Sequence, residues 1–367
     1  MRFLPLAALV LAASPACAAE GWKMQFFHDQ AGSSLTLTDL CFASPAHGFA
    51  SGFLSERKKT RPILLRTADG GESWHFQKAG DIGTSLFFLN DVRGWLVTMK
   101  GMYQTADGGN TWKKMAGGPK DALRVYFRDE RHGWLVGFNK SMLVTGDGGA
   151  TWTPVPAAAE IKSSPENTSF SWIAFAGEKN GVVAGSSIPQ RRGRQIFPDW
   201  MEPEYAEKRR EWPALSILLE TRDGGASWSA STTSIFGRIT RVRLTPDGRG
   251  LGLIEFFNAF DWPAEVFRID WRAGKSERVF RARDRVVTDV ALPEDGPAYL
   301  AGYEPPGQLA RSPVPGRLHI LRSQDLAAWQ EMEIDYRAVA RRAMISAWDR
   351  DHIWVATDTG MILRLTR

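Results

Sequence analysis

Four copies of one octapeptide carry the most regular candidate chemistry in this chain of 367 residues. The pattern is T-x-D-G-G-x-[ST]-W, and its Asp and Trp positions are Asp69 and Trp74, Asp107 and Trp112, Asp147 and Trp152, and Asp223 and Trp228. D-x-G-G is also a fragment of calcium loops, but a calcium cage needs several acidic or amide ligands at alternate positions. Those positions hold Gly, Glu, Asn, Ala or Ser. The octapeptide therefore predicts a structural hairpin turn, with glycines at positive φ and a Trp that packs into the core.

Other residue types that could support catalysis lack a usable spacing. The six histidines show no close metal-ligand pairing, and His47, His132 and His352 share one position just before an apolar strand, which favours turn residues. Cys41 lies in the apolar run Leu40–Phe42 and is interpreted as a small buried hydrophobe. The chain has no nucleophile elbow, phosphate loop or dinucleotide fingerprint in a strand–helix setting. We therefore predict no catalytic residue, no cofactor and no metal.

The elements that position the octapeptides form a longer repeat. An apolar strand, a polar turn and a second apolar strand precede each octapeptide, so one unit reads strand a, turn, strand b, loop, strand c, tight turn, strand d. A degenerate copy of the octapeptide, shorter by one residue, lies at Ser323–Trp329. Strand a recurs seven times, at 40–42, 86–88, 125–127, 173–175, 242–244, 290–292 and 344–347. This spacing predicts an all-β, seven-bladed β-propeller of four-stranded antiparallel blades.

The two ends of the chain complete the predicted ring. The last unit stops at Met361–Arg367, which reads as a strand c without a strand d. The segment Gly21–Met24 resembles the start of strand d elsewhere, as in Thr111–Met115. We therefore expect the N-terminal strand to complete the last blade, which leaves no free sheet edge.

The first residues predict export. Residues 1–18 combine Arg2, a short apolar core and a small-residue cleavage zone, which is typical of a signal peptide and too short to span a membrane. A lipoprotein cut before Cys17 is the less favoured alternative, because Ser14–Ala16 lacks the usual Leu. We expect residues 19–367 to be one propeller domain, monomeric and without a transmembrane segment, in the periplasm or secreted.

Most long insertions fall in the b–c loops, which a meander places on the face opposite the Asp turns. They are Leu54–Pro62, Ile188–Pro213, Asn258–Pro263 and Tyr303–Pro315. Insertions on one face usually mark the binding face of a repeat protein. Arg beside aromatic residues suits carboxylates, phosphates or protein hot spots, and the segment at 188–213 is rich in both. The predicted partner-binding residues are Arg57, Lys58, Lys59, Arg61, Arg191, Arg192, Arg194, Trp200, Arg209, Arg210 and Trp212.

The octapeptide preceded by a G-W-x-V-G-like strand resembles the Asp-box (bacterial neuraminidase) repeat. The spacing from Gly133–Gly137 to Thr145–Trp152 resembles the photosystem II stability/assembly factor family. That resemblance implies a seven-bladed, non-catalytic assembly scaffold with an Arg-rich patch for docking. The long b–c insertions depart from the family pattern, which leaves the identity of the partner open.

Asp-box repeats also occur in sialidases, so a sialidase-like or other exo-glycosidase is the alternative function. A sialidase needs an Arg triad, a Tyr nucleophile beside a Glu, and an acid/base Asp. Tyr299, Tyr303 and Tyr336 are the possible nucleophiles, but no pairing with a Glu can be read from the sequence. The favoured function is an exported, non-catalytic scaffold that binds a protein or another acidic partner, and export argues against nucleic acid.

Overall fold

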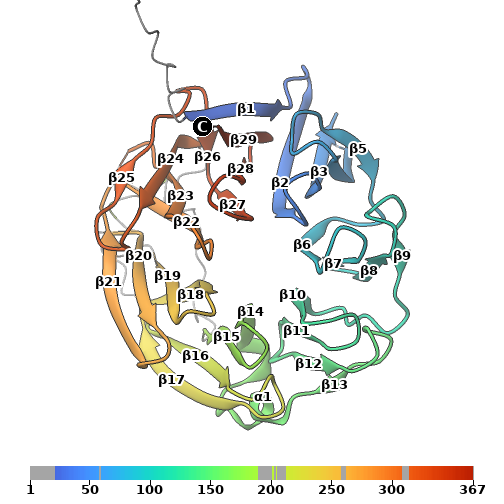
Figure 1. The fold of residues 1–367 in the computed structure, drawn as a ribbon, viewed down its shortest axis with the longest axis vertical. Helices are drawn as coiled ribbons and strands as arrows, with labels where there is room; N and C mark the ends of the chain where they lie inside the picture. The colour runs from blue at the N-terminus through green and yellow to red at the C-terminus, as the bar shows by residue number, and fades with distance from the viewer. Residues whose placement is uncertain are drawn as a thin grey trace, which may run out of the picture.

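The computed structural model describes residues 21–57, 59–188, 201, 204, 212–257, 262–307 and 314–366. Within these residues, seven antiparallel sheets stand around a central channel, and the strands of each sheet follow one another outwards from the channel to the rim (Figure 1). Each sheet is a meander whose strands follow one another in sequence, apart from the sheet that joins the two chain ends. The structure confirms the predicted all-β, seven-bladed propeller.

The first four blades follow one another along the chain. Blade 1 contains β2 (Ser33–Phe42), β3 (Gly48–Glu56), β4 (Lys59–Thr67) and β5 (His75–Lys78). Blade 2 contains β6 (Gly83–Phe88), β7 (Gly94–Thr98), β8 (Gly101–Thr105) and β9 (Lys113–Lys114). Blade 3 contains β10 (Ala122–Phe127), β11 (Gly133–Gly137), β12 (Met142–Thr145) and β13 (Thr153–Pro154). Blade 4 contains β14 (Thr168–Ala176), β15 (Asn180–Ser187), β16 (Ala214–Thr221) and β17 (Ser229–Ile235).

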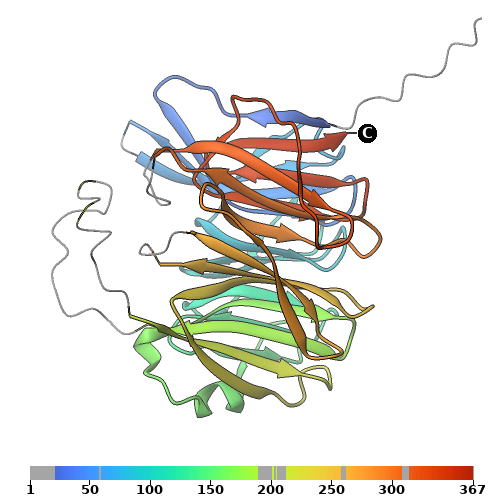
Figure 2. The same ribbon diagram turned by 90° about the vertical axis from the view of Figure 1, so that its left-hand side faces the viewer.

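The remaining blades complete the ring. Blade 5 contains β18 (Gly237–Leu244), β19 (Arg249–Phe256), β20 (Ala264–Asp270) and β21 (Lys275–Arg281). Blade 6 contains β22 (Val286–Ala291), β23 (Ala298–Glu304), β24 (Gly316–Ser323) and β25 (Gln330–Glu331), and β26 (Val339–Ala340) also pairs with β24. Blade 7 contains β27 (Ala343–Ala347), β28 (Ile353–Thr357), β29 (Met361–Thr366) and the N-terminal β1 (Gly21–Phe27). Helix α1 (Pro156–Glu160) and the 3-10 turn Pro165–Asn167 connect blades 3 and 4, and Figure 2 shows α1 at the edge of the disc.

The N-terminal strand closes the ring. β1 pairs antiparallel with β29, with Gly21 opposite Thr366 and Trp22 opposite Leu365. The Trp22 side chain is buried and packs edge-on against Tyr299, with ring centroids 6.5 Å apart. The structure therefore confirms that the first strand supplies the missing strand d of the last blade.

The turns between strands a and b and between strands c and d lie together at one end of the blades. The Gly70 amide donates to the Ala46 carbonyl at 2.8 Å, and the Gly148 amide donates to the Arg131 carbonyl at 2.9 Å, so each Asp turn is bonded to the neighbouring a–b turn. The b–c connections therefore lie at the opposite end, as predicted.

One predicted insertion is a continuation of the sheet. Residues 54–62 were expected to form a loop, but β3 runs to Glu56 and β4 begins at Lys59, with Leu54 opposite Arg61. The prediction of a loop here is wrong, because the two strands continue pairing up to a tight turn at Arg57, whose φ is 46°.

Aromatic rings fill the spaces between blades. The Phe42 ring at the end of β2 stacks on Trp354 of the preceding blade at 3.4 Å between centroids, and the octapeptide residue Trp74 meets Phe42 edge-on at 5.9 Å. We call such a set an aromatic wedge. It consists of one residue from strand b of a blade, one from the end of strand a of the next blade, and the Trp at or directly before the start of strand d of that next blade. The corresponding sets are Phe49, Phe88 and Trp112; Trp95, Phe127 and Trp152; and Trp134, Phe175 and Trp228. The wedge explains why Trp recurs in both repeated motifs.

Candidate functional site

The Asp residues of the octapeptides serve their own turns. Asp69 Oδ1 accepts the Thr67 hydroxyl at 2.7 Å and the Ser73 amide at 2.9 Å, and Asp69 Oδ2 accepts the Ser73 hydroxyl at 2.6 Å. The Thr67 hydroxyl also accepts the Gly71 amide at 2.8 Å. The same bonds recur in the turns of Asp107, Asp147 and Asp223. These carboxylates are therefore structural acceptors on the turn face.

The hydrogen bonds also determine the charge of these carboxylates. Bonds from the Ser73 hydroxyl and amide lower the pKa of Asp69 to about 2, and equivalent bonds from Thr111 lower the pKa of Asp107 to about 2. The ionised form is favoured because the donors stabilise the anion. Among the described residues, no group of three or more His, Cys, Asp or Glu side chains could hold a metal ion.

The sequence-predicted partner-binding residues fall into two sets. Arg57, Lys59 and Arg61 lie on the extended β3–β4 hairpin, where Arg61 pairs with Glu56 at 3.7 Å. Trp212 lies just before β16, and 70% of its side chain is exposed. The other predicted residues lie outside the described part of the chain: Lys58, Arg191, Arg192, Arg194, Trp200, Arg209 and Arg210. Their role as a partner-binding face therefore stays a prediction.

The possible glycosidase nucleophiles do not converge on a site. Tyr299 is 0% exposed and Tyr303 is 4% exposed, and both belong to the core of blades 6 and 7. Tyr336 is 82% exposed. A nucleophile must be reached by substrate, and the packing of Tyr299 and Tyr303 prevents this.

The histidines that share one position are turn residues. Nδ1 of His132 lies 2.9 Å from Asp129, and Nδ1 of His352 lies 2.8 Å from Asp349, each within its own a–b turn. His47 lies 3.4 Å from Asp91 of the next blade. Cys41 lies on β2 and is partly buried, so the prediction of a buried residue is met only in part. Desolvation raises the pKa of its thiol to about 12, so it is protonated at neutral pH.

The central channel holds a cluster of charged residues that sequence reasoning missed. One residue per blade occupies the position three before the strand a wedge residue. From blade 1 to blade 7 this position holds Asp39, Ser85, Arg124, Trp172, Arg241, Asp289 and Met344. In the first six blades a register shift lies just before this residue. A bulge re-aims the side chain that follows it, and five of these residues line one cavity in the channel: Asp39, Ser85, Arg124, Trp172 and Asp289. Met344, which no bulge precedes, packs instead in the core between blades 7 and 1.

Three guanidinium groups surround one indole ring: those of Arg124 and Arg241, and that of Arg243, which lies two residues after Arg241 on β18. The Cζ atoms of Arg124, Arg241 and Arg243 lie 4.2, 4.6 and 4.7 Å from the ring centroid of Trp172. The Trp172 indole N–H donates to the Val242 carbonyl at 2.7 Å, which fixes the ring across blades 4 and 5. Cation–π attraction favours this arrangement. The ring thus acts as a platform that holds three cations together.

Two carboxylates partly balance these cations. Asp289 Oδ1 lies 2.9 Å from Arg241 Nε and 3.7 Å from an Arg243 terminal nitrogen, and Asp39 Oδ2 lies 3.4 Å from an Arg124 terminal nitrogen. Both carboxylates also accept amides of the next blade, from Leu86 at 2.8 Å and from Ile345 at 3.2 Å. The two Asp residues therefore help to hold the ring together, and the cluster keeps one more cation than anion.

Burial makes this surplus of positive charge unfavourable. Desolvation lowers the pKa of Arg124 to about 10, and desolvation followed by repulsion from Arg241 lowers the pKa of Arg243. Burial opposes ionisation of Asp289, but Arg241 and Arg243 hold its pKa below the ordinary value. An anionic group that entered the channel would relieve the repulsion between the arginines. We call these residues the channel arginine site: Arg124, Trp172, Arg241 and Arg243, with Asp39 and Asp289.

The channel arginine site borders open space. A cavity of about 320 Å³ is lined by Asp39, Arg124, Trp172, Arg243 and Asp289, among others. Its lining residues come from the second halves of the inner strands, so the cavity lies in the half of the channel nearer the a–b turns. The Arg243 side chain is 34% exposed, whereas the Arg241 side chain is 5% exposed. Arg243 is thus the most accessible cation of the three.

Sequence comparison relates the chain to photosystem II assembly proteins. Residues 117–188 match the family described as "Photosynthesis system II assembly factor YCF48". The photosystem II assembly lipoprotein Ycf48 of Parasynechococcus marenigrum is 27% identical over 259 residues, which is 66% of this chain and 71% of the relative. The protein of the same name from Synechococcus sp. (strain CC9902) is 26% identical over 203 residues, which is 51% of this chain and 54% of the relative. The predicted resemblance to the assembly factor family is therefore confirmed.

Solved structures agree on the fold. A structure described as "YCF48 bound to D1 peptide" matches with a TM-score of 0.61 and 16% identity, over 97% of this chain and 100% of the other. YCF48 from Cyanidioschyzon merolae matches with a TM-score of 0.60 and 15% identity, over 94% of this chain and 98% of the other. At these identities the likeness shows a shared propeller fold.

The names of the relatives bear on two further predictions. The sequence relatives named above are assembly proteins, which agrees with the prediction that this chain is not an enzyme. Their names include the word lipoprotein, which fits an exported protein. These names do not support the prediction that cleavage of a signal peptide at residues 1–18 is favoured over a lipoprotein cut before Cys17. In the described part of the chain, none of the helices is long and apolar enough to cross a membrane.

Proposed function

We propose that this chain is an exported, non-catalytic scaffold that binds an acidic segment of another protein during assembly of a larger complex. The similarity to photosystem II assembly proteins supports the assembly role, and a solved protein of the same fold is described as bound to a peptide. The proposal rests on one observation, the convergence of Arg124, Arg241 and Arg243 on Trp172 in the channel. Planar guanidinium groups suit carboxylates, because they can donate two parallel hydrogen bonds.

The surplus cation gives the site its preference for an anionic partner. Asp39 and Asp289 are already bonded to arginines and to backbone amides, so a third carboxylate would pair first with Arg243, the most accessible of the three arginines. Binding of this kind weakens as salt increases, because part of the attraction is screened. A carboxylate at the end of a peptide or on an Asp or Glu side chain would satisfy the same geometry.

The test measures binding of a fluorescein-labelled peptide rich in Asp and Glu by fluorescence anisotropy, with the Asn and Gln version of the same peptide as reference. We expect Arg243→Gln to weaken binding of the acidic peptide by about tenfold or more, because a charge-assisted hydrogen bond is lost. The control is Lys113→Gln, which removes an exposed cation on the outer strand β9 and should leave binding unchanged. Equal binding by wild type and Arg243→Gln would refute the role of the channel.

The basic insertion at 188–213 is a second proposed docking surface, at the b–c end of the blades. Reversing Arg191, Arg192, Arg194, Arg209 and Arg210 to Glu should abolish partner capture while the melting temperature stays nearly unchanged. A large fall in the melting temperature would instead mean that these arginines stabilise the fold. Comparing this variant with Arg243→Gln assigns peptide binding to the insertion or to the channel.

A further inference from the structure

The interface between blades 4 and 5 lacks the aromatic wedge that occupies other interfaces. At the strand b position, where blades 2, 3 and 7 have Trp95, Trp134 and Trp354, blade 4 has Val182. At the end of the inner strand, blade 5 has Leu244 where blades 1 to 4 have Phe. The turn between β20 and β21 also lacks the octapeptide, so blade 5 has no Trp at the octapeptide position directly before strand d.

The neighbouring interfaces keep at least one ring of the set. Between blades 5 and 6, Trp329 lies edge-on to Phe280 at 6.4 Å. Between blades 6 and 7, Trp22 lies edge-on to Tyr299. Every wedge position of the seven interfaces falls within the described segments, and blades 4 and 5 form the interface without an aromatic residue at any of its three positions.

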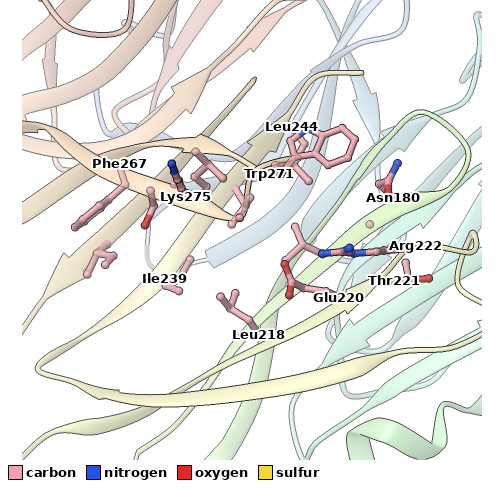
Figure 3. Close-up of a pocket in the computed structure, with 18 residues that line it drawn as sticks. Asn180, Leu218, Glu220, Thr221, Arg222, Ile239, Leu244, Phe267, Trp271 and Lys275 are labelled. Atoms are coloured by element: carbon pink, nitrogen blue, oxygen red, sulfur yellow. The ribbon is translucent and has the colours of Figure 1, made fainter. Parts of the chain in front are cut away.

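An apolar pocket of about 410 Å³ lies where the wedge is missing. Figure 3 shows Leu218, Ile239, Leu244 and Phe267 around this space, and Val182 also lines it. Trp271 is held at the edge, because its indole N–H donates to the Thr245 carbonyl at 3.0 Å. A small apolar space with few polar groups favours an apolar ligand and disfavours water.

The rim of the pocket is charged and lies at the Asp-turn end. Arg222 follows β16, Lys275 begins β21, and both are exposed; the exposed Glu220 lies beside them. The rim residues therefore carry one more cation than anion. The segment 188–213 follows the last residue of β15, Ser187, whereas the pocket lining includes Asn180, the first residue of that strand.

We propose that this interblade pocket takes an aromatic side chain from an acidic segment of a partner protein. The ring would occupy the place that Trp and Phe rings of this chain occupy at equivalent interfaces. Carboxylates next to that ring in the partner would meet Arg222 and Lys275 at the rim. This site goes beyond the channel arginine site and does not rest on it, because its main contacts are apolar and lie between two blades.

The first test uses indole as the probe, with binding followed by chemical-shift changes of Val and Leu methyl groups. Wild type should bind indole, and Val182→Trp, which restores the repeat residue, should weaken binding by about tenfold or more, because the new ring fills the space. The same substitution should raise the melting temperature by a few degrees. Leu244→Phe is the second filling variant, in case Val182→Trp fails to fold. Failure of wild type to bind indole would overturn the proposal.

A matched control comes from the next interface. Leu251 occupies in blade 5 the position that Val182 occupies in blade 4, but it is 0% exposed and belongs to a core against which Trp329 packs. Leu251→Trp should overfill that core, lower the melting temperature and leave indole binding unchanged. If Val182→Trp destabilised the protein as much as Leu251→Trp did, and Leu244→Phe left indole binding intact, the space would not be a ring site.

The second test identifies the source of the ring. Two fluorescein-labelled acidic peptides, one with a central Trp and one with Ala at that place, are compared by anisotropy. The Trp peptide should bind more tightly to wild type, and Val182→Trp should remove the difference between the two peptides while any shared affinity for the channel remains. Indole binding without a preference for the Trp peptide would refute the commitment to a partner side chain.

Discussion

Replacing Trp22 with Ala tests how much the N-terminal strand contributes to the closed ring. The Trp22 side chain is 8% exposed, so nearly all of its surface is buried against Tyr299 and the last blade. A buried Trp removes about 150–250 Å² from water, which corresponds to about 4–6 kcal/mol at about 25 cal/mol per Å². Measured losses for such substitutions are about 3–5 kcal/mol. We expect a loss of that size in the free energy of unfolding.

Phe27→Ala is the matched control, because Phe27 lies at the other end of β1 and is 46% exposed. Phe27→Ala should lower the free energy of unfolding by about 2–3 kcal/mol, since roughly half as much surface is buried. Urea unfolding followed by circular dichroism measures both values. Hydrogen exchange should also rise in β29, where Leu363 and Leu365 pair with β1, and stay unchanged in blade 2. Equal losses for the two variants, or protection of β29 unchanged in Trp22→Ala, would refute the reasoning that β1 closes the ring through Trp22.

Three further predictions concern the turns and the thiol. Three octapeptide Asp residues, Asp69, Asp107 and Asp223, have a pKa of about 2 in the folded protein, below the ordinary 3.8. The stability that their ionised form contributes is therefore present above about pH 4 and is lost as the pH falls towards 2. The triple Asp→Asn variant should have a lower melting temperature at pH 7, and its melting temperature should change less between pH 4 and 2. Gly225→Ala should lower the melting temperature, because φ is +87° and the new Cβ would meet Trp134, whereas Gly146→Ala, with nothing within 4 Å, should be close to neutral; similar shifts for both would contradict the role of the glycine. Cys41 should react with a thiol reagent more slowly in the folded protein than in urea at pH 7, because partial burial and desolvation raise its pKa to about 12, and equal rates would count against a raised pKa.

The repeated turns show why the architecture could be predicted. In each octapeptide the Thr, Asp and Ser or Thr side chains bond to groups within four residues, so the local sequence is sufficient to specify the turn. The wedge repeats as well, because Phe42, Trp74 and their counterparts recur at fixed spacing. The closure by β1 was predictable too, since the last unit lacked one strand and the first segment resembled one.

The prediction for residues 54–62 failed because strand length depends on pairing. The polar residues Thr60 and Arg61 read as a loop, but Ser55 and Leu54 lie opposite them and continue the ladder. Cross-strand partners, rather than local polarity, decide where such a hairpin ends.

The channel arginine site depends on tertiary structure. Asp39, Arg124, Trp172, Arg241 and Asp289 are separated by tens to hundreds of residues, and nothing in any one segment marks them as neighbours. The signal becomes visible only when the inner strands are aligned at one position, because the ring brings that position of most blades to the channel. The pocket between blades 4 and 5 likewise arises from missing aromatic residues, and their absence can be recognised only after the wedges of the other interfaces are known.

The sequence alone therefore determined the repeat, the turn chemistry, the blade count and the closure, because these depend on contacts that are local or that repeat at a fixed spacing. The tertiary structure alone decided which charged side chains meet, how deeply they are buried, and where a missing ring leaves space. Those properties arise from packing between blades, and packing joins residues whose separation along the chain carries no information about their contact.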